Sequence, residues 1–351
     1  NMLTKEKREE VKAFLLKNLD AHQTDIIKFT AENNGLTKQA VWAYLEKLIS
    51  EGIIEKEGER KKIKYKLHQH NSFFSFKRKS DLAEHVVFLD KIKPALPEGL
   101  PENVRQICNT AFSEIFNNAV DHSEAKDITV SVTYDALKIR MSISDDGVGI
   151  FNKIQKALNL EHPQYAILEL AKGKLTTAPQ KHSGEGIFFT SRMVNSFLIL
   201  SGGLAFYGHK NQDVIFESPG KETGTYVVMM INRDSAIHPA DVYIEYEAGD
   251  NDDYAFSKTI VPVKLMQYEG EALVSRSQAK RLISRFERFK NVILDFDGVK
   301  LIGQSFADEV FRVFTTEHPK INLIPINISG EVKKMIAHVT ANKEMNSTIK
   351  K

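Results

Sequence analysis

SEIFNNAVDHS, residues 113–123, is the stretch of the chain that says most about its fold and chemistry. Apolar residues at helical spacing surround it, and we expect one helix over residues 102–122. Glu114 and Asn118 are four residues apart and share one face of this helix, with Asp121 near that face. The amide oxygen of Asn118 can coordinate magnesium, and the Glu114 carboxylate can orient and deprotonate water. Polar residues with this spacing are also typical of an ordinary solvated helix face.

A second informative stretch is SISDDGVGI, residues 142–150, in which alternating apolar residues predict a strand that ends in a turn. In the functional interpretation, the Asp145 carboxylate binds an exocyclic amino group, and Gly147 and Gly149 let the backbone approach a nucleotide. An ordinary turn at the end of a strand is the alternative for this fragment alone.

Two further glycine-bearing stretches follow. SGEGIFFTSRM, residues 183–193, places Gly184 and Gly186 directly before a predicted helix, whose free NH groups and positive dipole end suit a phosphate. GTYVVMMI, residues 224–231, predicts a strand in which Thr225 could reach a base directly or through water. Each stretch alone is weak, because a GxG pair is common and a plain hairpin strand would have the same sequence pattern.

In this order the four stretches resemble the motifs of the ATP-binding domain of the gyrase, heat-shock chaperone, histidine kinase and MutL (GHKL) superfamily. The matching residues are Glu114, Asn118 and Asp121 in the N box, Asp145, Gly147 and Gly149 in the DxGxG box, Gly184 and Gly186 in the second glycine box, and Thr225 in the closing strand. The resemblance implies a two-layer α+β sandwich that binds ATP with magnesium. It places adenine on Asp145, makes Asn118 the magnesium ligand and makes the polar, irregular residues 151–183 the ATP lid. Lys181 in that lid is a further candidate for nucleotide contact.

The resemblance leaves the activity open, because the superfamily hydrolyses ATP in some members and transfers its phosphate to histidine or serine in others. His85, in AEHVVFLDK, lacks the polar, proline-bearing context of a phospho-acceptor histidine, which disfavours a histidine kinase. Glu114 would serve equally well to activate water or a serine hydroxyl. A scaffold that binds nucleotide without turnover is disfavoured, because Glu114, Asn118, Asp145 and both glycine pairs are all present.

Residues 4–67 have the predicted order helix, helix, helix, hairpin and resemble a winged helix-turn-helix, which gives a first domain of residues 1–70. The resemblance implies DNA binding, with groove contacts from the third helix and phosphate contacts from the wing. The candidate residues are Lys38, Gln39 and Trp42 in the helix and Arg60, Lys61, Lys62 and Lys64 in the wing. Winged helices also serve as protein-docking or dimer modules, and Trp42 could instead be buried against the ATP-binding domain.

The last part of the chain, residues 236–351, alternates predicted strands and helices and should form an α/β domain, which leaves residues 71–235 for the ATP-binding domain. NVILDFDGVKLIGQSFADEVFRV, residues 291–313, resembles a STAS-like fold of the anti-sigma antagonist type, in which a helix after a strand carries a regulatory serine. Gln304 occupies the usual phosphoserine position, so we expect Ser305 to be the N-cap of that helix. The domain is expected to dock a protein partner.

Length and composition suit a multidomain protein in which each domain has a core of its own. The chain has 351 residues, of which 48 are basic and 46 acidic, and this balance excludes a global basic field for nucleic acid. The single Cys108 excludes an intrachain disulfide framework. No run of about 18 apolar residues could span a bilayer, so we expect a cytoplasmic protein without membrane contact.

These modules predict an intracellular ATP-binding regulator, most simply in transcription, in which nucleotide binding or hydrolysis controls the engagement of DNA or of a protein partner. The alternative is an anti-sigma-type protein serine kinase that acts on a STAS-domain partner. A homodimer is compatible with either function.

Overall fold

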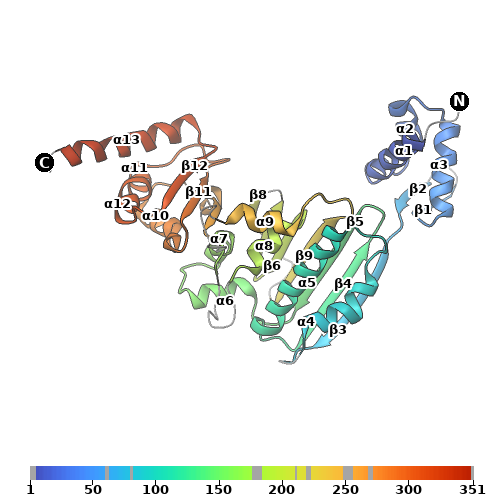
Figure 1. Cartoon of the computed structure of the whole chain (residues 1–351), viewed down its shortest axis with the longest axis horizontal. Helices are drawn as coiled ribbons and strands as arrows, with labels where there is room; N and C mark the ends of the chain where they lie inside the picture. Colours follow the sequence, from blue (N-terminus) through green and yellow to red (C-terminus); the bar gives the residue numbers. More distant parts are fainter. Residues whose placement is uncertain are drawn as a thin grey trace.

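Three separate sheets organise the chain and mark an N-terminal, a central and a C-terminal part (Figure 1). The computed structural model describes residues 5–59, 63–79, 82–175, 184–209, 212–218, 223–247, 256–267 and 272–348. Four residues named above as candidate contacts lie outside the described residues: Arg60, Lys61, Lys62 and Lys181. The N-terminal and C-terminal parts lie at opposite ends of the central part in Figure 1.

The N-terminal part consists of three helices followed by an antiparallel hairpin. Its elements are α1 (Lys5–Asn18), α2 (Ile26–Asn34), α3 (Lys38–Ser50), β1 (Ile54–Glu57) and β2 (Lys64–Leu67). Gly35, with a φ of 63°, ends α2 in the left-handed conformation that glycine favours. The Thr37 hydroxyl then caps α3 by accepting the NH of Ala40 at 3.2 Å. Leu15, Leu45 and their neighbours form a hydrophobic core of their own, against which Ala136 and Leu137 of the central part pack.

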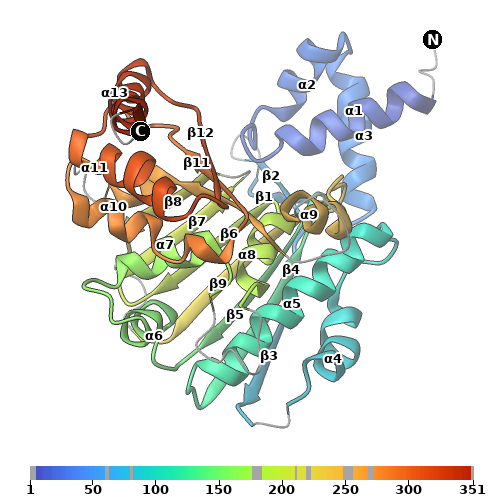
Figure 2. The same ribbon diagram turned by 60° about the vertical axis from the view of Figure 1, so that its left-hand side comes forward.

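A seven-stranded antiparallel sheet in the order β3-β4-β5-β9-β6-β7-β8 forms the central part. Its strands are β3 (His70–Lys77), β4 (Asp127–Tyr134), β5 (Lys138–Asp145), β6 (Ser196–Ser201), β7 (Leu204–His209), β8 (Gln212–Glu217) and β9 (Thr225–Asn232). Figure 2 shows α5 (Glu102–His122) and α8 (Gly186–Met193) lying over one face of this sheet, and α4 (Glu84–Val87) lies beside α5. The β5–β9 register sets Asp145 opposite Thr225, so two of the motif stretches meet at one end of the sheet.

The segment after β5 differs from the expectation, because most of its described residues, 151–175, are helical. It contains α6 (Ile150–Ala157) and α7 (Gln164–Lys172). Residues 166–172 are all buried, so α7 lacks the one-sided apolar spacing by which a surface helix is recognised. Glu169 and Lys172 make the segment look polar, yet both side chains are buried. Residues 176–183 of the expected lid lie outside the described residues.

The C-terminal part is built on a parallel three-stranded sheet in the order β10-β11-β12, reached from the central part through α9 (Pro239–Tyr246). Its elements are β10 (Lys258–Pro262), α10 (Arg276–Ile283), β11 (Asn291–Asp295), α11 (Gln304–Asp308), α12 (Phe314–Glu317), β12 (Asn322–Ile326) and α13 (Gly330–Thr348). The expectation that Ser305 caps α11 is wrong. Gly303 is the N-cap residue, because its backbone is extended (φ −80°, ψ 159°) and its carbonyl accepts the NH of Ala307 at 3.0 Å. Ser305 is the second residue of the helix and is exposed.

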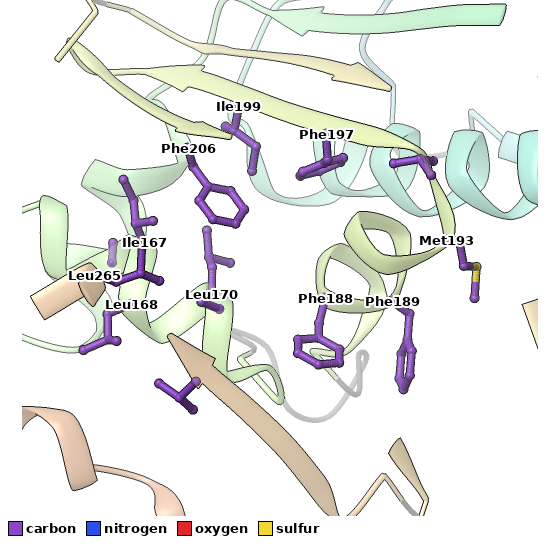
Figure 3. Packing of buried hydrophobic residues seen from close by; sticks show 14 of the residues in the cluster. Ile167, Leu168, Leu170, Phe188, Phe189, Met193, Phe197, Ile199, Phe206 and Leu265 are labelled. Atoms are coloured by element: carbon purple, nitrogen blue, oxygen red, sulfur yellow. The ribbon is translucent and has the colours of Figure 1, made fainter. Parts of the chain in front are cut away.

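The central and C-terminal parts share one hydrophobic core, which differs from the expectation of one core per domain. Figure 3 shows the junction: Ile167, Leu168 and Leu170 of α7 lie below the strands that carry Ile199 and Phe206. Leu265 of the C-terminal part lies beside these α7 residues in the same cluster. α7 therefore belongs to both parts, since each covers one of its sides.

Candidate functional site

A cavity lies between α5, the turn after β5, α7 and the start of α8, and all four motif stretches contribute to its wall. The candidate residues that line it are Asn118, Asp145, Gly149, Gly184 and Thr225. The other lining residues are Ile115, Ala119, His122, Ser123, Ile143, Ile150, Lys153, Ile154, Leu170, Leu175, Ile187 and Val227. A mostly apolar wall with a few polar groups suits a ligand that has a flat apolar portion and a polar edge.

The Asp145 carboxylate is held firmly in this wall. Its side chain is buried, and its Oδ1 accepts the backbone NH of Gly147 at 2.9 Å and that of Thr225 at 3.2 Å. The Thr225 Oγ1 in turn accepts the NH of Ile150 at 3.1 Å. These bonds fix the orientation of the carboxylate, so it is prepared to accept a hydrogen bond from one ligand position.

Close approach of the backbone explains why glycines stand around this carboxylate. A Cβ atom at Gly147 would lie 1.9 Å from the carbonyl oxygen of Ser123, and one at Gly224 would lie 2.0 Å from that of Asp145. Gly149 has a φ of 82°, a conformation that other residues rarely adopt. The glycines therefore allow three backbone segments to meet at one point.

The closest of these approaches gives a test. Gly147→Ala should destabilise the protein by about 3 kcal/mol, because the added methyl group meets a backbone carbonyl that cannot rotate away. Thermal unfolding followed by circular dichroism measures the change. Gly330→Ala is the matched control, since a Cβ atom there meets nothing within 4 Å. Equal melting temperatures of the two variants would contradict the steric argument.

Glu114 lies beside the cavity and is not among the residues of its wall. Its carboxylate lies against the start of α8, where a Cβ atom at Gly186 would be 2.0 Å from Oε2. Burial, followed by the charges of Glu114 and Glu185, raises the pKa of Tyr243, so α9 borders the same group. The start of a helix favours anions. Glu114 therefore lies against a helix start of the kind that can also bind an anion.

Asp121 and Lys153 are placed differently from the sequence interpretation. Asp121 is exposed and is not among the lining residues. Lys153 of α6 does line the cavity, and its Nζ donates to the carbonyl of His122 at 2.7 Å and to Glu124 Oε1 at 2.8 Å. Lys153 is not among the residues predicted from the sequence, because residues 151–183 are expected to be irregular. The helical spacing of Phe151 and Ile154 was the signal that could have found it.

Asn118, the expected magnesium ligand, lies in the cavity wall. Among the residues that the structure describes, no group of three or more His, Cys, Asp or Glu side chains is arranged to hold a metal ion. Magnesium in nucleotide sites commonly keeps several waters and binds phosphates plus one or two protein oxygens. The residues therefore fit a magnesium ion that arrives with the nucleotide.

The candidate DNA contacts that the structure describes are on the surface of the N-terminal part. Lys38, Gln39 and Lys64 are exposed, and Trp42 is 52% exposed. The alternative that buries Trp42 against the central part is therefore wrong.

No helix in the described part of the chain is both long and apolar enough to cross a membrane.

Comparison with known families agrees with this geometry. Residues 80–204 match the model of the histidine kinase-like ATPase domain. Residues 278–333 match the model of the STAS-like domain of unknown function (DUF4325). The comparison with curated proteins gave no match. The chain thus joins a histidine kinase-like ATPase domain to a STAS-like domain.

Proposed function

We propose that the protein is a cytoplasmic regulator controlled by ATP, in which nucleotide binding to the central part changes how the flanking parts engage their partners. The observation that carries this proposal is the cavity in which Asn118, Asp145 and Thr225 meet, with Asp145 fixed by two backbone NH groups. The matches to an ATPase domain and a STAS-like domain support a regulator built from these modules.

In the proposed mechanism Asp145 accepts a hydrogen bond from the exocyclic amino group of adenine, and the apolar wall packs against the base. Asn118 holds magnesium, which neutralises phosphate charge when bound. The NH groups at the start of α8 bind phosphate oxygens. Glu114, whose carboxylate lies against the same helix start, orients and deprotonates the attacking water.

Titration calorimetry of the full chain with ATP and magnesium tests the proposal. We expect saturable binding of one nucleotide per chain that weakens when magnesium is removed. If no heat of binding is detected at either of two temperatures, the chain does not bind ATP and the proposal is wrong.

We also propose that the N-terminal part binds DNA and that ATP alters this binding. The supporting observation is the exposure of Lys38, Gln39, Trp42 and Lys64 on one small helical unit with its own core. Lys64→Ala should weaken binding to DNA of any sequence several-fold. It should also reduce the slope of log Kd against log salt concentration by about one, as expected when one phosphate contact is lost. Lys7→Ala, on α1 and outside the candidate set, is the control.

Fluorescence anisotropy with labelled duplex DNA measures these affinities with ATP, with ADP and without nucleotide. Equal affinities in the three conditions would contradict the coupling to ATP. A Lys64→Ala variant that binds like wild type would contradict the DNA contact itself.

A second candidate function is a protein serine kinase that acts on a STAS-domain partner. The observation in its favour is the exposed Ser305 near the start of α11 in a STAS-like domain. With γ-labelled ATP, this function predicts label on the chain or on a STAS-domain protein. Release of free phosphate with none on protein would exclude it and leave hydrolysis.

A further inference from the structure

The end of α7 lies within residues 151–183, the segment expected to be the ATP lid, and it borders the nucleotide cavity. Leu170 and Leu175 line the cavity, and the NH of Leu175 bonds the carbonyl of Gly184, another residue of the cavity wall, at 2.9 Å. We use the term lid root for residues 169–175. A contact that holds the lid root in place therefore also holds Leu170 and Leu175 in the cavity wall.

Arg285 of the C-terminal part binds the lid root directly. Its guanidinium donates from Nη1 to Glu169 Oε2 at 2.6 Å, and from Nη2 to the carbonyls of Gly173 at 3.0 Å and Lys174 at 2.5 Å. Carbonyl groups at the end of a helix lack partners within the helix, and here a cation from another domain supplies one. The side chain is 9% exposed, and Arg285 has a φ of 68°, so an uncommon backbone conformation aims it at α7.

Lys172 forms the reciprocal contact from α7 into the C-terminal part. Its Nζ donates to Glu169 Oε1 at 2.6 Å and to the carbonyls of Arg281 and Ser284, each at 3.0 Å. Its own carbonyl accepts the Thr259 hydroxyl at 2.8 Å. The ammonium group is fully buried, and these three acceptors satisfy all three of its donors.

Lys174 adds a third cation at the same place. Its Nζ donates to the carbonyl of Arg288 at 3.0 Å and lies over the rings of Phe256 and Phe289, at 5.5 and 5.1 Å from their centres. Arg288 returns a bond from Nη1 to the carbonyl of Lys174 at 3.0 Å. Each side of the junction therefore binds the backbone of the other.

A purely structural junction would not need these charges. A buried ion pair usually stabilises a fold no more than well-packed apolar residues of the same volume, because the charges must be removed from water. The contacts of Arg285 are instead directional, because its planar guanidinium donates to one carboxylate and two carbonyls at fixed angles. All three hydrogen bonds can form only when the lid root is in one position.

We propose that Arg285 is a positioning residue of the nucleotide site: the STAS-like part holds the lid root through it, so nucleotide binding and the state of the STAS-like part are coupled. The inference rests on the proposed ATP site for its functional consequence, whereas the contacts themselves do not depend on it. By reciprocity, ATP binding must change the stability of the contact between the STAS-like part and the lid root by the same free energy by which that contact changes the affinity for ATP.

Hydrogen exchange of the full chain, with and without ATP and magnesium, is the first measurement. Wild type should exchange more slowly with ATP at residues 169–175 and also at 281–288. Arg285→Ala without nucleotide should exchange faster at 169–175, and calorimetry should give a dissociation constant for ATP raised about tenfold. Arg285→Lys should be intermediate, because an ammonium group can keep Glu169 but not both carbonyls. Arg276→Ala is the control, since that side chain is 64% exposed and its ion pairs stay within the C-terminal part.

A folded Arg285→Ala variant with wild-type exchange at 169–175 and wild-type affinity for ATP would overturn the proposal. If that variant does not fold, the wild-type comparison decides, and ATP binding without any effect at 281–288 overturns it. If wild type binds no ATP, the proposed function fails, while exchange at 169–175 in Arg285→Ala still tests the contact.

Discussion

Asp145→Asn should raise the dissociation constant for ATP by about 100-fold, which corresponds to about 2.7 kcal/mol. The asparagine can keep the oxygen that accepts the NH groups of Gly147 and Thr225, so the turn and the sheet should stay intact. Its other terminal atom is then an NH₂ group. The asparagine NH₂ group and the adenine amino group are both hydrogen-bond donors and would face each other. In a largely apolar cavity neither group would find an acceptor.

Titration calorimetry with ATP and magnesium measures this loss, with circular dichroism to show that the variant is folded. Asp146→Asn is the matched control in the neighbouring position. Its carboxylate is exposed, and Oδ1 accepts the NH groups of Lys126 and Asp127 instead of lining the cavity. We expect its affinity for ATP to remain within about twofold of wild type. If Asp145→Asn binds ATP as wild type does, the assignment of Asp145 to adenine is wrong.

Glu114→Gln should reduce ATP turnover by about 10²–10⁴-fold while leaving the dissociation constant for ATP within a few-fold of wild type. The amide has the size of the carboxylate but cannot take a proton from water. Binding should survive because Glu114 is outside the cavity wall that would surround the nucleotide. Phosphate release in single-turnover conditions measures the chemical step apart from product release.

Glu102→Gln is the control for this variant, because Glu102 is in the first turn of the same helix and its exposed side chain pairs with Arg105. It should hydrolyse ATP at the wild-type rate. Gly186→Ala gives an independent check, since its methyl group must displace the Glu114 carboxylate and should also slow turnover. If Glu114→Gln hydrolyses ATP at the wild-type rate, a group other than Glu114 activates the water.

The sequence was most informative where function and local geometry depend on the same few residues. The turn after β5 needs Gly147 and Gly149 for steric reasons, and the helix that carries Glu114 and Asn118 has clear apolar spacing. These local signals predicted the ATPase-like and STAS-like resemblances, and both were confirmed by the family matches. The winged-helix resemblance and the roles of the individual site residues stay predictions.

The sequence was least informative where tertiary contacts override local pattern. α7 looked polar because Glu169 and Lys172 interrupt its apolar residues, yet each finds its partner inside the protein. Arg285 is far from Glu169 in the chain, and no local pattern marks two residues that meet only after both sheets have formed. For the same reason, the shared core of the central and C-terminal parts could not be predicted from either segment alone.

The core shared by these two parts also has a consequence for synthesis on the ribosome. α7 cannot reach its final environment when its own residues emerge, because the carbonyls that receive Lys172 belong to Arg281 and Ser284, 109 and 112 residues later. At about 5–20 residues per second this delay is roughly 5–20 s. During that interval the apolar residues of α7 lack the partners that bury them in the complete fold, and they are exposed to aggregation. The small N-terminal unit, with its own core, can fold outside the ribosome well before Arg281 and Ser284 are synthesised.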